Sequence, residues 1–230
     1  MIPQMSNMPL PARDRTIIDF VLRHRMATNR TIGASVLPGR SRNAVTKVTA
    51  RLCANEILTR YTFIPPETYF RLGPRAINVL GLSPRLTEPL GPQSLPINYA
   101  TLIYISTTKT PRRRLTRLEL SEYLPWLCPK LATSPYCLDP AGRLDLIRVD
   151  LGASPQHIAR KVTSDVIERL DVPQLAELAV QSRFRVAVLT TSDEKSRLIG
   201  TAVRGAGCPD VVPIHLVVIP GLSVLLLRSS

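Results

Sequence analysis

The sequence predicts an α+β protein with two modules, a helical module closed by a β-hairpin and a following α/β domain. Three stretches with helical spacing precede two β-rich segments within residues 13–72. A Pro-, Gly- and Ser-rich segment follows at 81–96. From residue 144 onward, strand-like apolar runs alternate with amphipathic stretches. That alternation is typical of an α/β layer with a partly parallel sheet.

The charge of the chain is concentrated in its first half. The 230 residues carry a formal net charge of +13. Residues 1–118 contain 18 Lys/Arg and 5 Asp/Glu, a difference of +13, whereas residues 119–230 contain 12 of each. A basic region beside a neutral one predicts a module that binds a polyanion, joined to a module with another task. A basic surface that is merely solvated is the alternative.

Three helices are expected in the first module. Residues 13–25 place apolar side chains on one side of a helix. Thr28 or Asn29 caps a second helix that ends near Pro38-Gly39, and Ser41 caps a third. In the third helix three apolar residues at i, i+3 and i+7 face inward, namely Val45, Val48 and Leu52. Basic and polar side chains occupy its other positions.

A β-hairpin and a short helix complete this module. Residues 57–64 alternate and are rich in β-branched and aromatic side chains, Pro65-Pro66 forms the turn, and residues 68–72 return. Gly73-Pro74 ends the hairpin and starts the helix.

Three helices followed by a hairpin is the order of a winged helix-turn-helix, which we expect over residues 10–82. Its third helix would lie in the major groove of DNA and its hairpin would contact the flanking backbone. Arg and Lys bind phosphates or guanine, and Asn reads adenine. The predicted DNA contacts are Arg40, Ser41, Arg42, Asn43, Thr46, Lys47, Arg51, Arg60 and Arg71. A small helical domain that binds protein is the alternative.

A linker is expected over residues 83–97, and the second domain over 98–230. The segment "INYATLIYIST" at 97–107 fits a short helix or a strand. The cluster after it is either a second set of phosphate contacts or a solvated charge run; its members are Arg112, Arg113, Arg114 and Arg117.

The second domain is expected to contain strands in residues 144–152, 184–192 and 211–219, with helices in 154–170, 172–183 and 192–207. The apolar tail from Val211 to Leu227 contains a histidine, two prolines and a glycine. It therefore predicts two buried strands joined at Pro220-Gly221 rather than a membrane span.

The cysteines and the N-terminus indicate a cytoplasmic protein. The four cysteines Cys53, Cys128, Cys137 and Cys208 are scattered, without zinc-site spacing, and are expected in the core. The N-terminus lacks the continuous apolar stretch of a signal peptide. Nucleotide-binding glycine motifs and histidine pairs at zinc or catalytic spacing are also absent from the sequence.

The motifs "CLDP", "IRVDLG" and "HIARKV" follow this module and linker. Together they resemble the bacterial replication-relaxation family of plasmid and mobile-element proteins, from about Arg13 onward. The second domain of that family resembles the PD-(D/E)xK restriction-endonuclease fold. The resemblance implies catalytic positions at Asp139, Asp150 and Lys161. The pattern is only partly kept, because Leu138 replaces the proline and Arg148 stands at the usual glutamate.

Metal-dependent phosphodiester cleavage requires carboxylates that converge on Mg²⁺ and a lysine near the attacking water. Here the triplet Asp150-Leu151-Gly152 lacks that lysine, and Arg148 is expected to neutralise Asp150. The sequence therefore favours a degenerate domain that does not cleave, with no metal or cofactor; Mg²⁺ enters only under the nuclease alternative.

The expected function is sequence-selective binding of double-stranded DNA, as a transcriptional regulator or as an accessory factor for replication or mobilisation of a mobile element. The C-terminal domain would form a homodimer or hold a partner protein, and no membrane association is expected. The alternatives are a Mg²⁺-dependent endonuclease and a protein-interaction adaptor whose basic surface meets an acidic partner.

Overall fold

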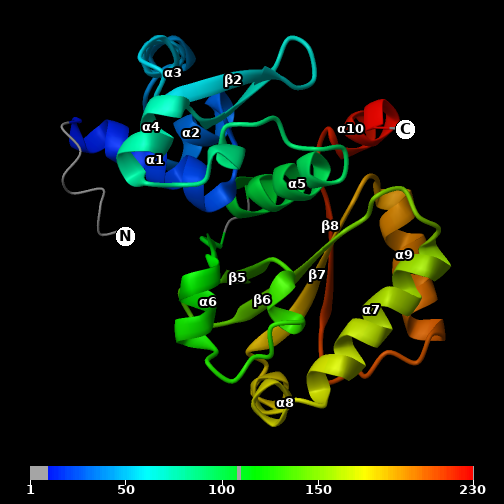
Figure 1. Cartoon of the computed structure of the whole chain (residues 1–230). Helices are drawn as coiled ribbons and strands as arrows, with labels where there is room; N and C mark the ends of the chain where they lie inside the picture. Colours follow the sequence, from blue (N-terminus) through cyan, green and yellow to red (C-terminus); the bar gives the residue numbers. More distant parts are fainter. Residues whose placement is uncertain (1–9, 108–109, 230) are drawn as a thin grey trace. The chain divides into compact units, whose positions relative to one another are not determined.

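The structure is a computed structural model that describes residues 10–107 and 110–229 (Figure 1). The chain divides into two compact units, residues 1–102 and 103–230, each with its own hydrophobic core. The division falls inside helix α5 (Ser94–Thr107). Both units mix helices and strands, so the predicted α+β class is confirmed at this level.

The first unit has the predicted order of helices followed by a hairpin. Its elements are α1 (Ala12–His24), β1 (Ala27–Thr28), α2 (Asn29–Ser35), α3 (Arg42–Ala54), β2 (Leu58–Thr62), β3 (Thr68–Leu72) and α4 (Pro74–Leu80). The three strands form an antiparallel sheet in the order β1-β3-β2. Thr28 caps α2 and Ser41 caps α3, as the sequence predicts. Each cap satisfies a backbone N–H that has no partner inside its helix.

The core of the first unit joins its helices to its sheet. Ile17 and Ile18 of α1, Val45 and Leu52 of α3, and Phe70 of β3 are almost fully buried in one cluster. A buried side chain of this size contributes roughly 1.5–3 kcal/mol relative to an exposed one. The third predicted core position of α3, residue 48, is only half-buried at the edge of this cluster.

The segment after α4 differs from the expected linker. It contains a 3₁₀ turn, η2 (Pro84–Leu86), and the start of α5. Nε of Arg71 donates to the carbonyl of Leu86 (3.1 Å), and the hydroxyl of Tyr69 accepts from the N–H of Leu90 (3.0 Å). Residues 83–90 are therefore a packed part of the first unit, because the hairpin binds their backbone. Residues 97–107 are helical, which settles the helix-or-strand alternative.

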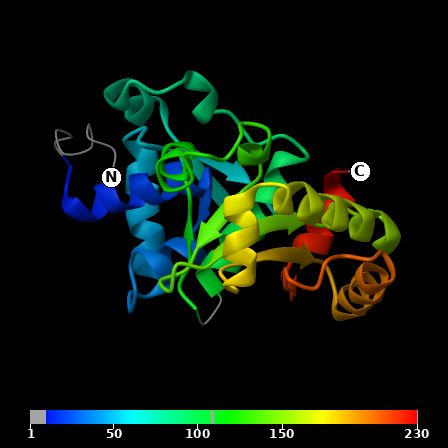
Figure 2. The same cartoon turned by 90° about the horizontal axis from the view of Figure 1, so that it is seen from below.

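The second unit is built on a mixed five-stranded sheet. Its elements after α5 are β4 (Arg113–Arg114), α6 (Arg117–Tyr123), η3 (Leu131–Thr133), β5 (Tyr136–Leu138), β6 (Leu144–Val149), α7 (Pro155–Leu170), α8 (Pro173–Val180), β7 (Phe184–Thr190), α9 (Asp193–Gly205), β8 (Ile214–Val218) and α10 (Leu222–Ser229). The strand order is β4-β5-β6-β7-β8. The first two pairings are antiparallel, whereas β6, β7 and β8 run parallel and side by side (Figures 1 and 2).

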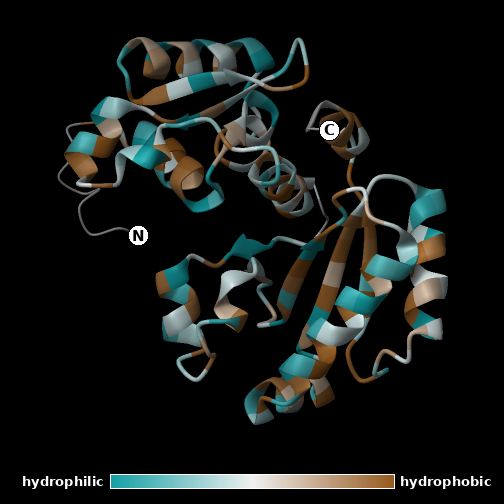
Figure 3. Cartoon of the chain, turned by 45° about the vertical axis from the view of Figure 1, so that its right-hand side comes forward, coloured by the Kyte–Doolittle hydropathy of each residue, from teal (hydrophilic) through white to brown (hydrophobic). Residues whose placement is uncertain are grey.

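One face of this sheet packs against helices α7, α8 and α9. Leu146 of β6 and Val186 of β7 share a cluster with Val162 of α7, Leu175 of α8 and Ile199 of α9. The central strands are mainly hydrophobic, and the helices mix apolar with polar residues (Figure 3). Because side chains alternate along a strand, Asp145 and Ile147 of β6 point to the opposite face.

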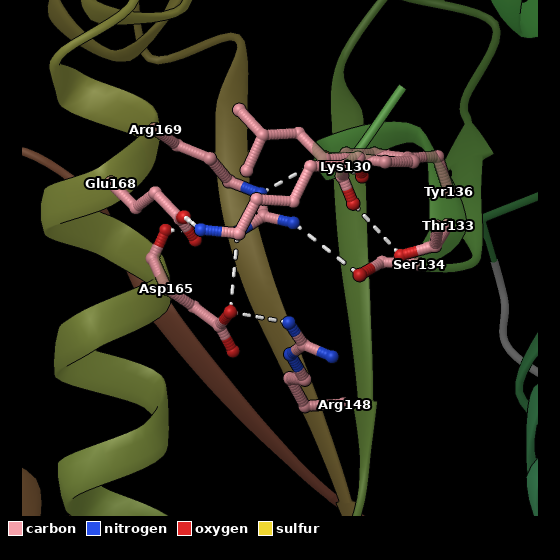
Figure 4. A network of polar contacts seen from close by, with 9 residues as sticks. Lys130, Thr133, Ser134, Tyr136, Arg148, Asp165, Glu168 and Arg169 are labelled. Atoms are coloured by element: carbon pink, nitrogen blue, oxygen red, sulfur yellow. Dashed lines mark hydrogen bonds and ion pairs between the residues drawn. The ribbon is translucent and has the colours of Figure 1, made fainter. Parts of the chain in front are cut away.

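A buried arginine of α7 forms hydrogen bonds with the loop before β5 and with β5 itself (Figure 4). Nε of Arg169 donates to the hydroxyl of Tyr136 (2.9 Å), and Nη2 donates to Oγ of Ser134 (3.3 Å). Asp165, one turn earlier on α7, forms ion pairs with both Arg169 and Arg148 of β6. Each nitrogen of the Arg169 guanidinium thus has an acceptor, as a buried charge requires.

The apolar tail agrees with the prediction in its first part and differs from it in its second part. Residues 214–218 form the expected strand β8, but residues 222–229 form helix α10 instead of a second strand. Gly221, with φ of +79°, makes the turn between them. In the described ranges 10–107 and 110–229, no helix combines the length and apolar character that crossing a membrane requires.

Candidate nucleic-acid interface

Helix α3 presents a basic and polar surface in the first unit. Arg42, Asn43, Thr46 and Lys47 are exposed, whereas Val45 on the opposite side is buried. The first turn of α3 has no acidic residue and begins with an arginine. Basic side chains at a helix N-terminus oppose the helix dipole, at a cost of about 0.3–1 kcal/mol each. The same arrangement attracts an anion to the start of the helix.

Hydrogen bonds between α2 and α3 fix the position of this surface. Asn29, the first residue of α2, accepts from the hydroxyl of Thr49 (2.9 Å) and donates to the hydroxyl of Thr46 (3.4 Å). The hydroxyl of Thr46 in turn donates to the carbonyl of Arg42 (3.0 Å). The exposed face of α3 is therefore held at a defined angle to α2.

A cleft of about 350 Å³ opens where α2, α3 and the tip of the hairpin meet. Three arginines line it: Arg30 of α2, Arg40 before α3 and Arg42 of α3. Residues 66–68 of the hairpin line the other side and include one acidic residue, Glu67. The cleft is thus predominantly cationic, and it adjoins the exposed face of α3.

Of the nine predicted DNA contacts, Arg40, Ser41, Arg42, Asn43, Thr46 and Lys47 lie together at the start and along the exposed side of α3. Arg60 of β2 is also exposed, with its guanidinium carbon 5.8 Å from the centroid of the Phe70 ring. Arg60 also partly offsets the desolvation that raises the pKa of the nearby Cys53 thiol.

Two of the predicted contacts have other partners. Arg71 is buried, and its guanidinium binds the carbonyls of Arg85 and Leu86. Its burial and these two hydrogen bonds make Arg71 a structural residue and not a DNA contact; desolvation and the nearby Arg25 lower its pKa. Nη2 of Arg51 lies 2.7 Å from the buried carboxylate of Asp14. This predicted DNA contact is therefore engaged in an ion pair within the protein.

The second arginine cluster also contains both buried and exposed members. The side chain of Arg112 is 5% exposed, and its Nε lies 2.9 Å from Oδ2 of Asp145. The prediction that Arg112 contacts phosphate is therefore wrong, because the buried carboxylate of β6 holds it. Arg113 is half-exposed and pairs with Glu119 (2.9 Å). Arg117 is exposed at the start of α6, whereas Arg114 is partly buried in β4.

The carboxylates expected for a nuclease site lie at opposite ends of β6. Asp139 is in the hairpin before β6, where its Oδ1 accepts from the N–H of Arg143 (2.9 Å). Asp150 follows the last residue of β6. At the rise of an extended strand, this places them about 20 Å apart. They cannot share one Mg²⁺, whose oxygen ligands lie within about 2.1 Å.

Asp150 has a lysine partner other than the expected one. Lys195, in the first turn of α9, places its Nζ 2.8 Å from Oδ2 of Asp150, and the hydroxyl of Thr190 donates to the same oxygen (3.0 Å). Lys161 is exposed on α7, and Arg148 pairs with Asp165 rather than with Asp150. The expected neutralisation of Asp150 by Arg148 is therefore wrong. In residues 10–107 and 110–229, no three His, Cys, Asp or Glu residues are grouped as a metal site.

The cysteines differ in burial. Cys137 is fully buried, as expected, but Cys128 is exposed and Cys53 and Cys208 are half-buried. Cys137 stands beside Asp145 in the sheet, and burial followed by the charge of Asp145 raises the pKa of its thiol to about 12.

Sequence reasoning missed Arg30, Asn29 and Lys195. Arg30 is the second residue of α2, and a cation in the first turn of a helix is unfavourable, which is a local signal that the residue has another purpose. Lys195 and Asp150 are 45 residues apart in the sequence. Their pairing depends on parallel strands ending at one edge, which no local pattern reveals. Comparison of the chain with protein-family models, with curated proteins and with solved structures finds no match.

Proposed function

We propose that this protein binds double-stranded DNA with sequence selectivity, through the exposed face of α3 and the arginine-lined cleft beside it. The observation that supports this most is the convergence of Arg30, Arg40 and Arg42 on one cleft. Like charges that gather without an acidic partner for each of them repel one another. A polyanion offsets that repulsion and releases its condensed counterions.

The order and pairing of the elements support a winged helix-turn-helix as the DNA-binding module. In that module α3 is the recognition helix and the β2–β3 hairpin is the wing. The six residues at the start and along the exposed side of α3 carry both kinds of contact that such a helix needs. Arg and Lys bind phosphates or guanine edges, whereas Asn43 and Thr46 are suited to base edges.

The biological roles that fit are transcriptional regulation and assistance in the replication or mobilisation of a mobile element. Both follow from the proposed resemblance to the replication-relaxation family and from a basic module joined to a neutral α/β unit. The positions of Asp139 and Asp150 give the endonuclease alternative no support. The adaptor alternative differs from DNA binding in one measurable respect, because an adaptor has no affinity for duplexes.

The test is the affinity for a fluorescent mixed-sequence duplex, measured by anisotropy over a range of salt concentrations. We expect log K to fall linearly with log salt, with a slope of about −0.9 for each phosphate contacted. Arg42→Ala and Lys47→Ala should each weaken binding and flatten the slope by about 0.9. Arg160→Ala, at an exposed position of α7, is the matched control and should change neither.

Selection from a random duplex library then tests selectivity, and an enriched motif is the expected result. A chain with no affinity for any duplex at low salt would favour the adaptor. Incubating plasmid DNA with the protein and Mg²⁺ or Mn²⁺ tests the endonuclease alternative. If the protein cleaves the plasmid and Asp150→Ala abolishes this cleavage, an endonuclease function would replace the proposed function.

A further inference from the structure

The hydroxyl of Thr46, on the exposed face of α3, already has partners within the protein. It donates its proton to the carbonyl of Arg42 (3.0 Å), and it accepts from Nδ2 of Asn29 (3.4 Å). A threonine hydroxyl has one proton to donate and two lone pairs. Thr46 therefore has no proton left for an acceptor on a bound ligand while its bond to Arg42 is intact.

Asn29 holds this arrangement from the neighbouring helix α2. Its Oδ1 accepts from the hydroxyl of Thr49, a buried residue of α3 (2.9 Å). The same hydroxyl also donates to the carbonyl of Thr46 (3.1 Å). Because Oδ1 of Asn29 binds Thr49, its Nδ2 is directed at Thr46. The network thus fixes the orientation of the Thr46 side chain in the free protein, and it leaves the methyl group as the part that a ligand can contact.

The side chains in the middle of the exposed face of α3 are short and uncharged. At about 100° per residue, Asn43, Thr46 and Ala50 occupy this middle sector. Arg42 flanks the sector on one side and Lys47 on the other, and all five residues are exposed. When such a helix lies in the major groove, cations at its sides reach phosphates and the middle positions face the base edges.

The base edges in the major groove differ in what they offer to these short side chains. Guanine N7 and O6, adenine N7 and thymine O4 are acceptors, which require a donor that Thr46 has already used. Thymine also presents its 5-methyl group, which makes favourable contacts with an apolar group such as a threonine methyl. Asn43 carries both a donor and an acceptor, which is the combination that adenine requires.

We propose that Thr46 is a specificity-determining residue whose methyl group contacts the 5-methyl group of a thymine in the major groove. Cytosine has a hydrogen at this position, so a C·G pair in place of the T·A pair loses the contact. The inference names a base that α3 reads and the group that reads it. It rests on the proposed binding of duplex DNA.

The test uses the duplex that selection from the random library enriches. The duplex is made again with one thymine at a time replaced by deoxyuridine, which removes only the 5-methyl group. At one position, the wild-type protein should bind the uracil duplex about three- to fivefold more weakly, as expected for the loss of one methyl contact. Fluorescence anisotropy at one fixed salt concentration measures the affinities.

Two variants separate the methyl group of Thr46 from its hydroxyl. Thr46→Ser keeps the hydroxyl and lacks the methyl group, so it should bind the thymine and uracil versions of that position equally. Thr46→Val keeps the methyl group and lacks the hydroxyl, so it should retain the wild-type difference. Circular dichroism and thermal melting establish that both variants are folded.

The outcomes distinguish this inference from the proposed function. Equal affinity for thymine and uracil at every position would overturn the inference, as would an enriched motif without a T·A pair. A difference that persists in Thr46→Ser would also overturn it, because another group would then make the contact. In each of these cases duplex binding itself stands. A protein with no affinity for any duplex would instead overturn the proposed function, and this inference with it.

Discussion

The buried carboxylate of Asp14 on α1 binds Nη2 of Arg51 on α3, at 2.8 and 2.7 Å from its two oxygens. Nε of the neighbouring Arg13 adds a third contact, at 3.1 Å. A fully buried carboxylate requires such partners, because it has left water. Arg51 therefore anchors the last turns of α3 to α1, while the basic residues of the first turns stay exposed.

This pair predicts that Arg51 and Lys47 act on different properties of the protein. Arg51→Ala leaves Asp14 short of hydrogen bonds and should lower the free energy of unfolding by about 1–3 kcal/mol. Lys47→Ala, on the exposed side of the same helix, should change it by no more than about 0.5 kcal/mol. Urea denaturation followed by circular dichroism measures both. Equal stabilities of the two variants would contradict the structural role of Arg51.

Substitution of Arg30 tests whether the cleft is part of the DNA interface, because Arg30 was not among the contacts predicted from the sequence. Arg30→Ala removes one of the three arginines that line the cleft. We expect the salt dependence of duplex affinity to flatten by about 0.9, which is the contribution of one phosphate contact. Thermal stability should not fall, because Arg30 is exposed and its charge opposes the dipole of α2. An unchanged slope with intact affinity would remove the cleft from the interface.

Most elements of both units follow from periodicity and capping residues. Thr28 and Ser41 mark the starts of α2 and α3, and the alternation around Tyr61 marks β2. Helices α5 and α10 do not follow from periodicity, because their apolar residues are not confined to one face. Short, continuous apolar runs fit a strand or a helix equally well. Only the packing of the folded unit separates the two.

The candidate site was predictable where it is local and unpredictable where it depends on distant partners. The exposed residues of α3 share one helix, so spacing alone groups them. Arg51, Arg71 and Arg112 have the same local appearance, but each binds an oxygen that is 14 or more residues away. The sequence around a basic residue does not show whether the folded chain places a buried acceptor beside its side chain.

The buried pair of Asp145 and Arg185 predicts a large loss of stability when it is broken. Nε of Arg185 lies 2.5 Å from Oδ1 of Asp145, and Asp145 also accepts from the hydroxyl of Tyr104 (2.8 Å). Arg185→Ala removes two hydrogen bonds from the fully buried carboxylate, which Arg112 still neutralises, so the free energy of unfolding should fall by about 1–3 kcal/mol. Arg197→Ala, at an exposed position of α9, is the control. A loss below 1 kcal/mol, measured by urea denaturation, would contradict this estimate.

The cysteines should differ in reactivity. The pKa of the Cys137 thiol is raised from 9.0 to about 12, which makes its thiolate about a thousandfold rarer at neutral pH. Because the thiolate is the reactive form, iodoacetamide should modify exposed Cys128 first and leave Cys137 unmodified in the native protein. Mass spectrometry of peptides after timed alkylation measures both sites. Modification of Cys137 at the rate of Cys128 would show that its part of the sheet opens readily.

His215 of β8 predicts a pH dependence of stability. Burial lowers its pKa below 6.5, and the nearby Arg185 and Arg112 lower it further, against the opposite effect of Asp145. Between the lowered pKa and about 6.5 the unfolded chain binds more protons than the folded chain, so stability rises with pH across this window. The free energy of unfolding should therefore fall on acidification from about pH 7.5 to about pH 5.5, and His215→Gln should reduce that fall. His157→Gln, at an exposed position of α7, leaves the other titrating groups in place and should keep the wild-type dependence. Identical pH profiles for His215→Gln and the wild type would show that this histidine keeps its ordinary pKa in the folded chain.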